Sequence, residues 1–194
     1  MARMPRYEEP GAYYHFASRG NNKQTIFDDE LRGLFLQLVR RVADAYDWRV
    51  LAYALMGNHY HLVVKIGERG FSEGMCVLNG KFARASNGRF DRINHCLGRR
   101  FWSAHLDTEH YLLNSVRYCH WNPARANLCL DPAGSTWTSF RSSVGLDRAH
   151  PVLALDDLLG LFDRNLDRAR MALSAFVEEG RVRCQAPWDG PSST

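Results

Sequence analysis

The sequence lacks a long hydrophobic run and an apolar leader. Its 194 residues contain no stretch approaching the roughly 18 apolar residues that a membrane-spanning helix needs. Residues 1–11 are charged and have no apolar core of the kind found in signal peptides. We therefore expect a soluble, cytoplasmic protein that does not act at a membrane.

Paired cysteines and repeats are also missing. The five cysteines are an odd number, are widely spaced and include no CxxC pair. A disulfide framework or a zinc ribbon needs cysteines at short, regular spacing. The sequence therefore predicts reduced thiols. The hydrophobic content of the chain, 45%, is enough to form a core without cross-links.

The formal net charge is only +4, but the charge is distributed unevenly. Six basic residues and one acidic residue lie between Lys81 and Arg100, which suits a surface that contacts a phosphate backbone. Acidic residues outnumber basic ones, six to three, between Val152 and Gly180. We therefore expect the C-terminal part not to be the main surface for contact with a phosphate backbone.

The hydrophobic periodicity predicts an α+β fold. Asp28 or Asp29 is a good helix cap, and Gly57-Asn58 is a connection of the hairpin type. The expected elements, in chain order, are a strand at 12–18, a helix at 29–46, strands at 48–56 and 59–66, a helix at 71–90, a strand at 101–106 and a helix at 108–122. This order is that of a ferredoxin-like antiparallel sheet with helices on one face, followed by an extra helix.

The remainder of the chain is expected to add helices to this unit. Residues 127–145 are rich in turn formers, and residues 155–179 read as one or two helices. We predict a main domain at 1–145 and a C-terminal helical extension with a tail at 146–194.

His59-Tyr60-His61 opens the predicted strand at 59–66. Alternate residues of a strand project from the same face, so the two imidazoles can bind one metal ion. The alternative is a pair of ordinary surface or partly buried histidines. A central position in the sheet favours the metal-binding interpretation.

The helix at 108–122 carries a second group of polar residues. At about 100° per residue, Tyr118 and Asn122 are neighbours at i and i+4, on a face different from the apolar stripe. A phenol is a competent nucleophile toward phosphorus when a cation polarises the phosphate. The alternatives are a tyrosine at a helix–sheet boundary and an Asn122 that caps a new helix beginning at Pro123.

Four segments resemble those of a known family in the same order. They are GAYYHFASRGN at 11–21, MGNHYHLVV at 56–64, RYCHWNPARA at 117–126 and WTSF at 137–140. Together they resemble the REP-associated tyrosine transposases, which belong to the single-tyrosine transposase superfamily of HUH nucleases. The resemblance spans about residues 4–145.

The resemblance implies a site and a reaction. His59 and His61 match the metal ligands, Asn122 lies where the family supplies a third polar ligand, and Tyr118 matches the nucleophile. The implied cofactor is Mg²⁺ or Mn²⁺. Tyr118 would attack single-stranded DNA, form a 5′-phosphotyrosine and release a 3′-OH that can reverse the step, so that no nucleotide cofactor is needed.

The implied partner is a DNA hairpin with a short single-stranded flank. A loop at the end of the first strand is the expected base-reading segment, and the basic segment supplies the expected phosphate contacts. The expected DNA-binding residues are Arg19, Asn21, Asn22, Lys23, Gln24, Lys81, Arg84, Arg99 and Arg100. The sequence leaves open whether the active form is a monomer or a homodimer.

Two other functions are compatible with these residues. One is a domesticated protein that binds hairpin DNA without productive cleavage. The other is a metal-dependent RNA or nucleotide phosphoesterase that uses His59 and His61 without a tyrosine adduct.

Overall fold

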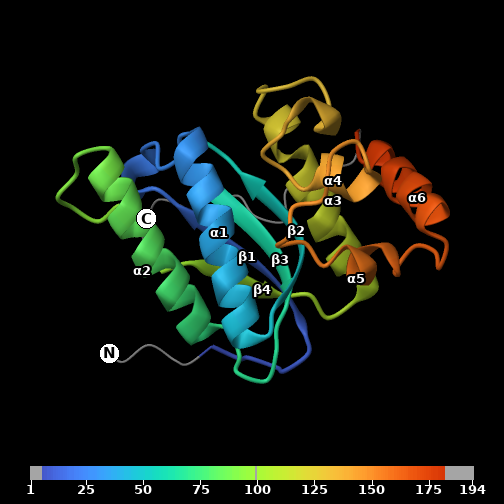
Figure 1. Ribbon diagram of the computed structural model, residues 1–194, viewed down its shortest axis with the longest axis horizontal. Helices are drawn as coiled ribbons and strands as arrows, with labels where there is room; N and C mark the ends of the chain where they lie inside the picture. The colour runs from blue at the N-terminus through green and yellow to red at the C-terminus, as the bar shows by residue number, and fades with distance from the viewer. Residues whose placement is uncertain (1–5, 99, 182–194) are drawn as a thin grey trace.

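Four antiparallel strands form the centre of the protein in a computed structural model that describes residues 6–98 and 100–181 (Figure 1). The strands lie in the order β2-β3-β1-β4. Their bounds are β1 Tyr13–Arg19, β2 Arg49–Leu55, β3 His59–Lys65 and β4 Trp102–His105. The predicted α+β architecture and its four strands are therefore confirmed.

β3 lies between β2 and β1, so the strand that carries the two histidines is central as expected. β2 turns directly into β3 through Gly57 and Asn58, and the amide of Met56 donates to the carbonyl of His59 at 2.9 Å. On the other side, His59 is paired with Arg19 and His61 with Ala17. These pairings fix which side chains of β1 lie near the histidines.

α1 (Asp29–Tyr46) and α2 (Ser72–Arg89) lie side by side over one face of the sheet (Figure 1). The Asp28 carboxylate caps α1 by accepting from the amide of Leu31 at 2.8 Å, and Asp47 ends it with a left-handed backbone, φ 54°. α2 forms despite three glycines. Gly74 has a packing reason, since a Cβ there would lie 2.6 Å from the Trp48 ring.

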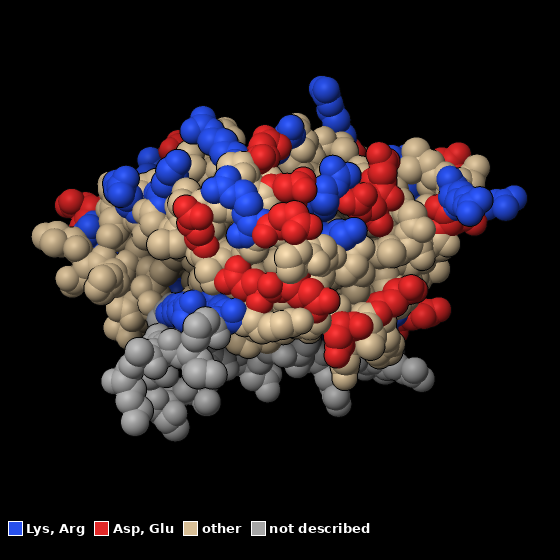
Figure 2. Space-filling view, turned by 90° about the horizontal axis from the view of Figure 1, so that it is seen from below, with Lys and Arg blue, Asp and Glu red and all other residues tan. Residues whose placement is uncertain are grey.

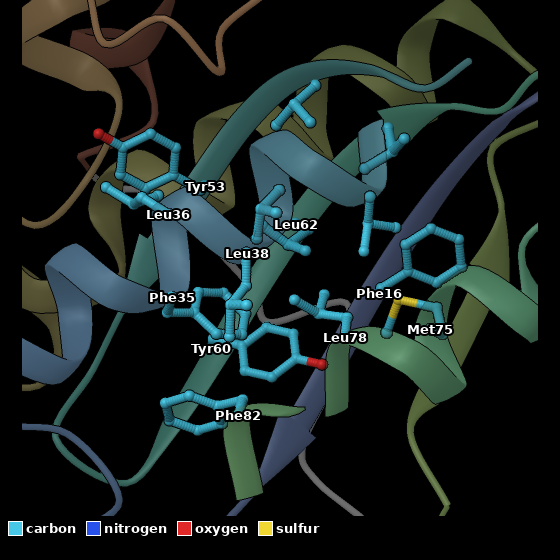
Figure 3. Close-up of a cluster of buried hydrophobic side chains, with 14 of the residues drawn as sticks. Phe16, Phe35, Leu36, Leu38, Tyr53, Tyr60, Leu62, Met75, Leu78 and Phe82 are labelled. Atoms are coloured by element: carbon cyan, nitrogen blue, oxygen red, sulfur yellow. The ribbon is translucent and has the colours of Figure 1, made fainter. Parts of the chain in front are cut away.

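The main hydrophobic core lies between this helical layer and the sheet (Figure 3). The Tyr60 ring is 4.5 Å from the Phe35 ring, and the Tyr60 hydroxyl donates to Asn79 of α2 at 2.5 Å. Phe16 and Leu62 are fully buried in the same cluster. Burying a side chain of this size contributes about 2 kcal/mol, so this layer holds β3 in one register.

The opposite face of the sheet is covered by later helices (Figure 1). They are α3 Glu109–Arg125, α4 Phe140–Val144, α5 Leu155–Leu159 and α6 Leu166–Glu179, and short 3₁₀ turns occur at η1 Asn21–Lys23 and η2 Pro132–Gly134. Val63 of β3, Val116 of α3 and Leu173 of α6 share one buried cluster. The sequence predicted the extra helix and the C-terminal helices, but not that they cover the second face. A boundary at residue 145 stays a prediction.

His120 of α3 is a buried titratable group that couples stability to pH. Its ring is fully buried and lies 3.0 Å from the Ser139 hydroxyl, and burial lowers its pKa from 6.5 to about 3. Between these two values the unfolded chain binds a proton that the folded protein does not, so acid favours unfolding. The contribution of neutral His120 to the free energy of unfolding is therefore present in full above pH 6.5 and is lost as the pH falls toward about 3.

We expect His120→Gln to reduce the pH dependence of the free energy of unfolding by about 1.4 kcal/mol per pH unit between pH 6 and pH 4. Urea titrations of both proteins at several pH values measure the two slopes. Equal slopes would contradict the assignment of a neutral, buried His120.

Candidate active site

β3 directs His59 and His61 to the face of the sheet that α3 covers. Their ring centroids are 5.2 Å apart, whereas Tyr60 between them lies in the core on the other face. His61 is fully buried, and His59 is partly exposed at the start of the strand. The predicted alternation of these three side chains is therefore present in the fold.

α3 brings Tyr118 to the same place. Thr108 caps the helix by accepting from the amide of Tyr111, and the apolar stripe of the helix, Leu112, Val116 and Cys119, packs in the core. The Tyr118 ring lies 5.1 Å from the His61 ring, edge to face. Only 6% of Tyr118 is exposed, so a substrate phosphate has narrow access to it.

Asn122, one turn further along α3, is hydrogen-bonded to His59. The helix does not stop at Asn122 but continues through Pro123 to Arg125. The interpretation of Asn122 as the cap of a new helix is therefore wrong. Two segments far apart in sequence, β3 and α3, therefore place two imidazoles, one amide and one phenol next to one another.

Both histidines are held neutral by their surroundings. Burial, followed by the positive charge of Arg19, lowers the pKa of His59 to about 4, and the hydrogen bond with Asn122 opposes this shift. Burial, the His15 and His59 rings and Arg19 lower the pKa of His61 well below its usual range. A neutral imidazole has the lone pair that a metal ligand needs.

Two imidazole nitrogens and one amide oxygen form a mixed donor set of the kind that divalent metal ions accept. The Asn58 side-chain oxygen lies 2.7 Å from Nδ1 of His59, and this oxygen can only accept. The Nε2 atom of His59 is therefore the nitrogen suited to ligation. Residues 6–98 and 100–181 contain no group of three or more His, Cys, Asp or Glu side chains placed to hold a metal ion.

His15 of β1 is a part of the site that sequence reasoning missed. It is fully buried, and its Nε2 lies 2.9 Å from Nδ1 of His61. A histidine within an otherwise apolar strand was the available signal. Its contact with His61 depends on the β1–β3 register, which composition alone does not give.

The segment from Arg19 to Gln24 lies at the same end of β3. Arg19 acts on both histidines through its charge, and Asn21, Asn22 and Lys23 are exposed. Gln24 has a structural contact instead, because its amide donates to the carbonyl of Cys96 at 3.0 Å. This segment therefore combines a charge near the candidate metal ligands with exposed polar side chains.

The other expected DNA contacts lie on or after α2. Lys81, Arg84 and Arg100 are exposed, while Arg99 lies outside the described residues. Arg84 lines a cavity of about 510 Å³ with Asn79, Asn87 and the loop at 93–97. Figure 2 shows acidic and basic side chains interleaved on the face that is seen from below. Charge of one sign therefore does not dominate that face.

α6 packs against α3, the helix that carries Tyr118. The indole NH of Trp121 donates to the carbonyl of Val177 at 2.7 Å, and the Arg117 guanidinium lies 3.5 Å from the centre of the Phe176 ring. These contacts flank Tyr118 in sequence on both sides. The C-terminal helix therefore helps to set the position of α3 against the sheet.

The sequence profile described as Transposase IS200 like matches residues 9–117, more than half of the chain. The protein belongs to the IS200-like transposase family, and the family resemblance inferred from its motifs is confirmed. The match ends one residue before Tyr118. The positions of Tyr118 and Asn122 against the histidines therefore come from the fold described above.

One solved structure shows the same fold, and two others align at lower scores. A REP-associated tyrosine transposase bound to a REP hairpin aligns with a TM-score of 0.65 and 16% identity, over 78% of this chain and 90% of that one. A putative transposase from Deinococcus radiodurans aligns at 0.42, with 16% identity over 57% and 87% of the two chains. The tRNA(His) guanylyltransferase of Saccharomyces cerevisiae aligns at 0.43, with 7% identity over 87% and 79%.

No curated protein matches the sequence significantly. In the part of the chain that the structure describes, none of the helices has the length and hydropathy of a membrane span.

The contact between Trp121 and Val177 predicts that α6 restrains α3. We expect Trp121→Phe to lower the free energy of unfolding by about 1 kcal/mol, because one buried hydrogen bond is lost. Hydrogen exchange should also become faster in the last turns of α3. Trp48→Phe is the matched control, since its indole donates to the carbonyl of Gly70 at 3.0 Å, far from Tyr118 in sequence. Similar exchange in α3 for both variants would contradict this role of α6.

Proposed function

We propose that this transposase family member is a metal-dependent endonuclease and strand transferase for single-stranded DNA. It acts on palindromic hairpin DNA through a 5′-phosphotyrosine at Tyr118. The observation that carries the proposal is the convergence of His59, His61 and Asn122 with the Tyr118 ring on one side of the sheet. Family membership supports the general class of reaction, DNA processing by a transposase.

Tyr118 is the proposed nucleophile. Its phenolic oxygen forms a bond to the scissile phosphorus, and the bond from phosphorus to the 3′ oxygen of the preceding nucleotide breaks. The phenolic proton leaves to solvent, and the released 3′ oxygen gains a proton. The phosphotyrosine remains a phosphodiester, so a 3′-OH attacks it in the reverse reaction without ATP.

His59, His61 and Asn122 would hold the cation, Mg²⁺ or Mn²⁺. When bound, this ion supplies positive charge that polarises the scissile phosphate. The side chains at the site have little exposure to water, because His61, Tyr118 and Asn122 are all buried. An electrostatic interaction is stronger in such an environment than in bulk water.

Hairpin DNA is the proposed substrate because a solved structure of the same fold contains a REP hairpin. Arg19 is suited to contact a phosphate close to the reacting one, since its charge already acts on both histidines. Asn21, Asn22 and Lys23 extend from the same end of the sheet. Arg84 and the cavity beside it offer a second contact for the strand.

The direct test is a labelled hairpin oligonucleotide with a single-stranded flank, incubated with Mn²⁺ and run on a denaturing gel. We expect a covalent adduct for the wild type and none for Tyr118→Phe. Tyr111→Phe is the matched control, because Tyr111 lies on the same helix but is 58% exposed. We expect this control to form the adduct at the wild-type level.

Two results would contradict the proposal. Binding of the hairpin without an adduct in any protein would indicate a DNA-binding protein that does not cleave. Cleavage that survives Tyr118→Phe would indicate a phosphoesterase that does not use a tyrosine adduct.

DNA binding gives a second prediction. We expect Arg84→Ala to weaken hairpin binding several-fold at low salt and to reduce the slope of log K against log salt by about 0.7–0.9, the value for one phosphate contact. Arg168→Ala is the control, because Arg168 is exposed on α6 and follows the acidic Asp167. Fluorescence anisotropy at several salt concentrations measures both slopes. Equal slopes for wild type and Arg84→Ala would exclude a phosphate contact.

A further inference from the structure

We propose that His15 is a positioning residue that determines which nitrogen of His61 carries the proton and so keeps Nε2 of His61 available as a metal ligand. This inference rests on the proposed function for the role of His61. It adds His15, which lies on the neighbouring strand β1, to the residues that act at the site.

The geometry places the two imidazoles against each other. His15 and His61 lie on neighbouring antiparallel strands. His61 is paired with Ala17, and His15 is two residues before Ala17 on β1. Residues two apart on a strand share a face, so His15 points to the same side as His61. Their ring centroids are 5.1 Å apart, and Nε2 of His15 lies 2.9 Å from Nδ1 of His61.

A neutral imidazole has one donor and one acceptor nitrogen, so this hydrogen bond has two possible directions. If Nδ1 of His61 donates to Nε2 of His15, the Nε2 atom of His61 keeps its lone pair. If Nε2 of His15 donates instead, the proton of His61 lies on its own Nε2, which then has no lone pair for a cation. Metal binding at Nε2 therefore requires His15 to accept, with the proton of His15 on Nδ1.

His59 differs from His61 in this respect. The partner of its Nδ1 is the side-chain oxygen of Asn58, which can only accept, so the tautomer of His59 is fixed by its partner. The partner of His61 can act in either direction. For His61 to act as a ligand, Nε2 of His15 must therefore be the acceptor of this hydrogen bond.

The surroundings of His15 fix the position of its ring. The ring is fully buried, lies 5.2 Å from the Trp102 ring of β4 and 5.9 Å from the Tyr118 ring of α3. Contacts on two sides restrict rotation of the imidazole. An acceptor held against the distal nitrogen of a ligating histidine fixes the ring orientation and increases the basicity of the ligating nitrogen.

The test uses three variants. His15→Phe removes the acceptor, and His15→Gln replaces it with an amide oxygen at a similar distance along the side chain. His120→Gln is the matched control, because His120 is also fully buried but lies against Ser139. Thermal unfolding of each variant establishes that it is folded.

We expect Mn²⁺ affinity, measured by electron paramagnetic resonance without DNA, to fall about 10- to 100-fold in His15→Phe, the range typical for loss of such a partner. His15→Gln should recover most of this loss, and His120→Gln should bind like the wild type. Wild-type affinity in His15→Phe would overturn the proposal. No recovery in His15→Gln would also overturn it, because a role in packing alone would explain both losses.

A second measurement decides the matter even if His15→Phe does not fold. Long-range ¹H–¹⁵N correlation spectra of the metal-free wild type report the tautomer of each histidine. We expect the proton of His61 on Nδ1, and a proton on Nε2 would refute the inference. A wild type that has this tautomer but does not bind Mn²⁺ would refute the proposed function and the ligand role, while the hydrogen-bond direction would stand.

Discussion

The alternation of side chains along β3 is the constraint on which the rest of the structure depends. Tyr60 and Leu62 point into the core beneath α1 and α2, and this requires His59 and His61 to point toward α3. A slip of one residue would exchange the two sets, placing imidazoles in the apolar core and a tyrosine at the site. The packing that stabilises the sheet and the placement of the candidate metal ligands therefore have the same physical origin.

Helices on both faces of the sheet give the site its electrostatic character. Because α3 and its supporting helices cover the second face, His15 and His61 are removed from water and stay neutral. The positive charge of Arg19 acts on both His59 and His61. The environment thus keeps both imidazoles neutral beside a cationic group, while the low exposure of Tyr118 limits access to the candidate nucleophile.

Local sequence signals predicted the parts of the fold that depend on local chemistry. The cap at Asp28 and the hairpin at Gly57-Asn58 were predictable because their partners lie within a few residues. The role of His15 was not, because its partner is 46 residues away and depends on strand register. Asn122 was ambiguous because Asn-Pro is also a capping signal, and only the continuation of α3 to Arg125 removes that alternative.

Anomalous diffraction from crystals grown with Mn²⁺ tests the central claim, that side chains from β3 and α3 converge on one cation, most directly. The account predicts a single strong peak within coordination distance of the Nε2 atoms of His59 and His61 and of the Asn122 side chain, on the side of the sheet that faces Tyr118. A protein that binds Mn²⁺ at another place, with these side chains unchanged, would contradict it.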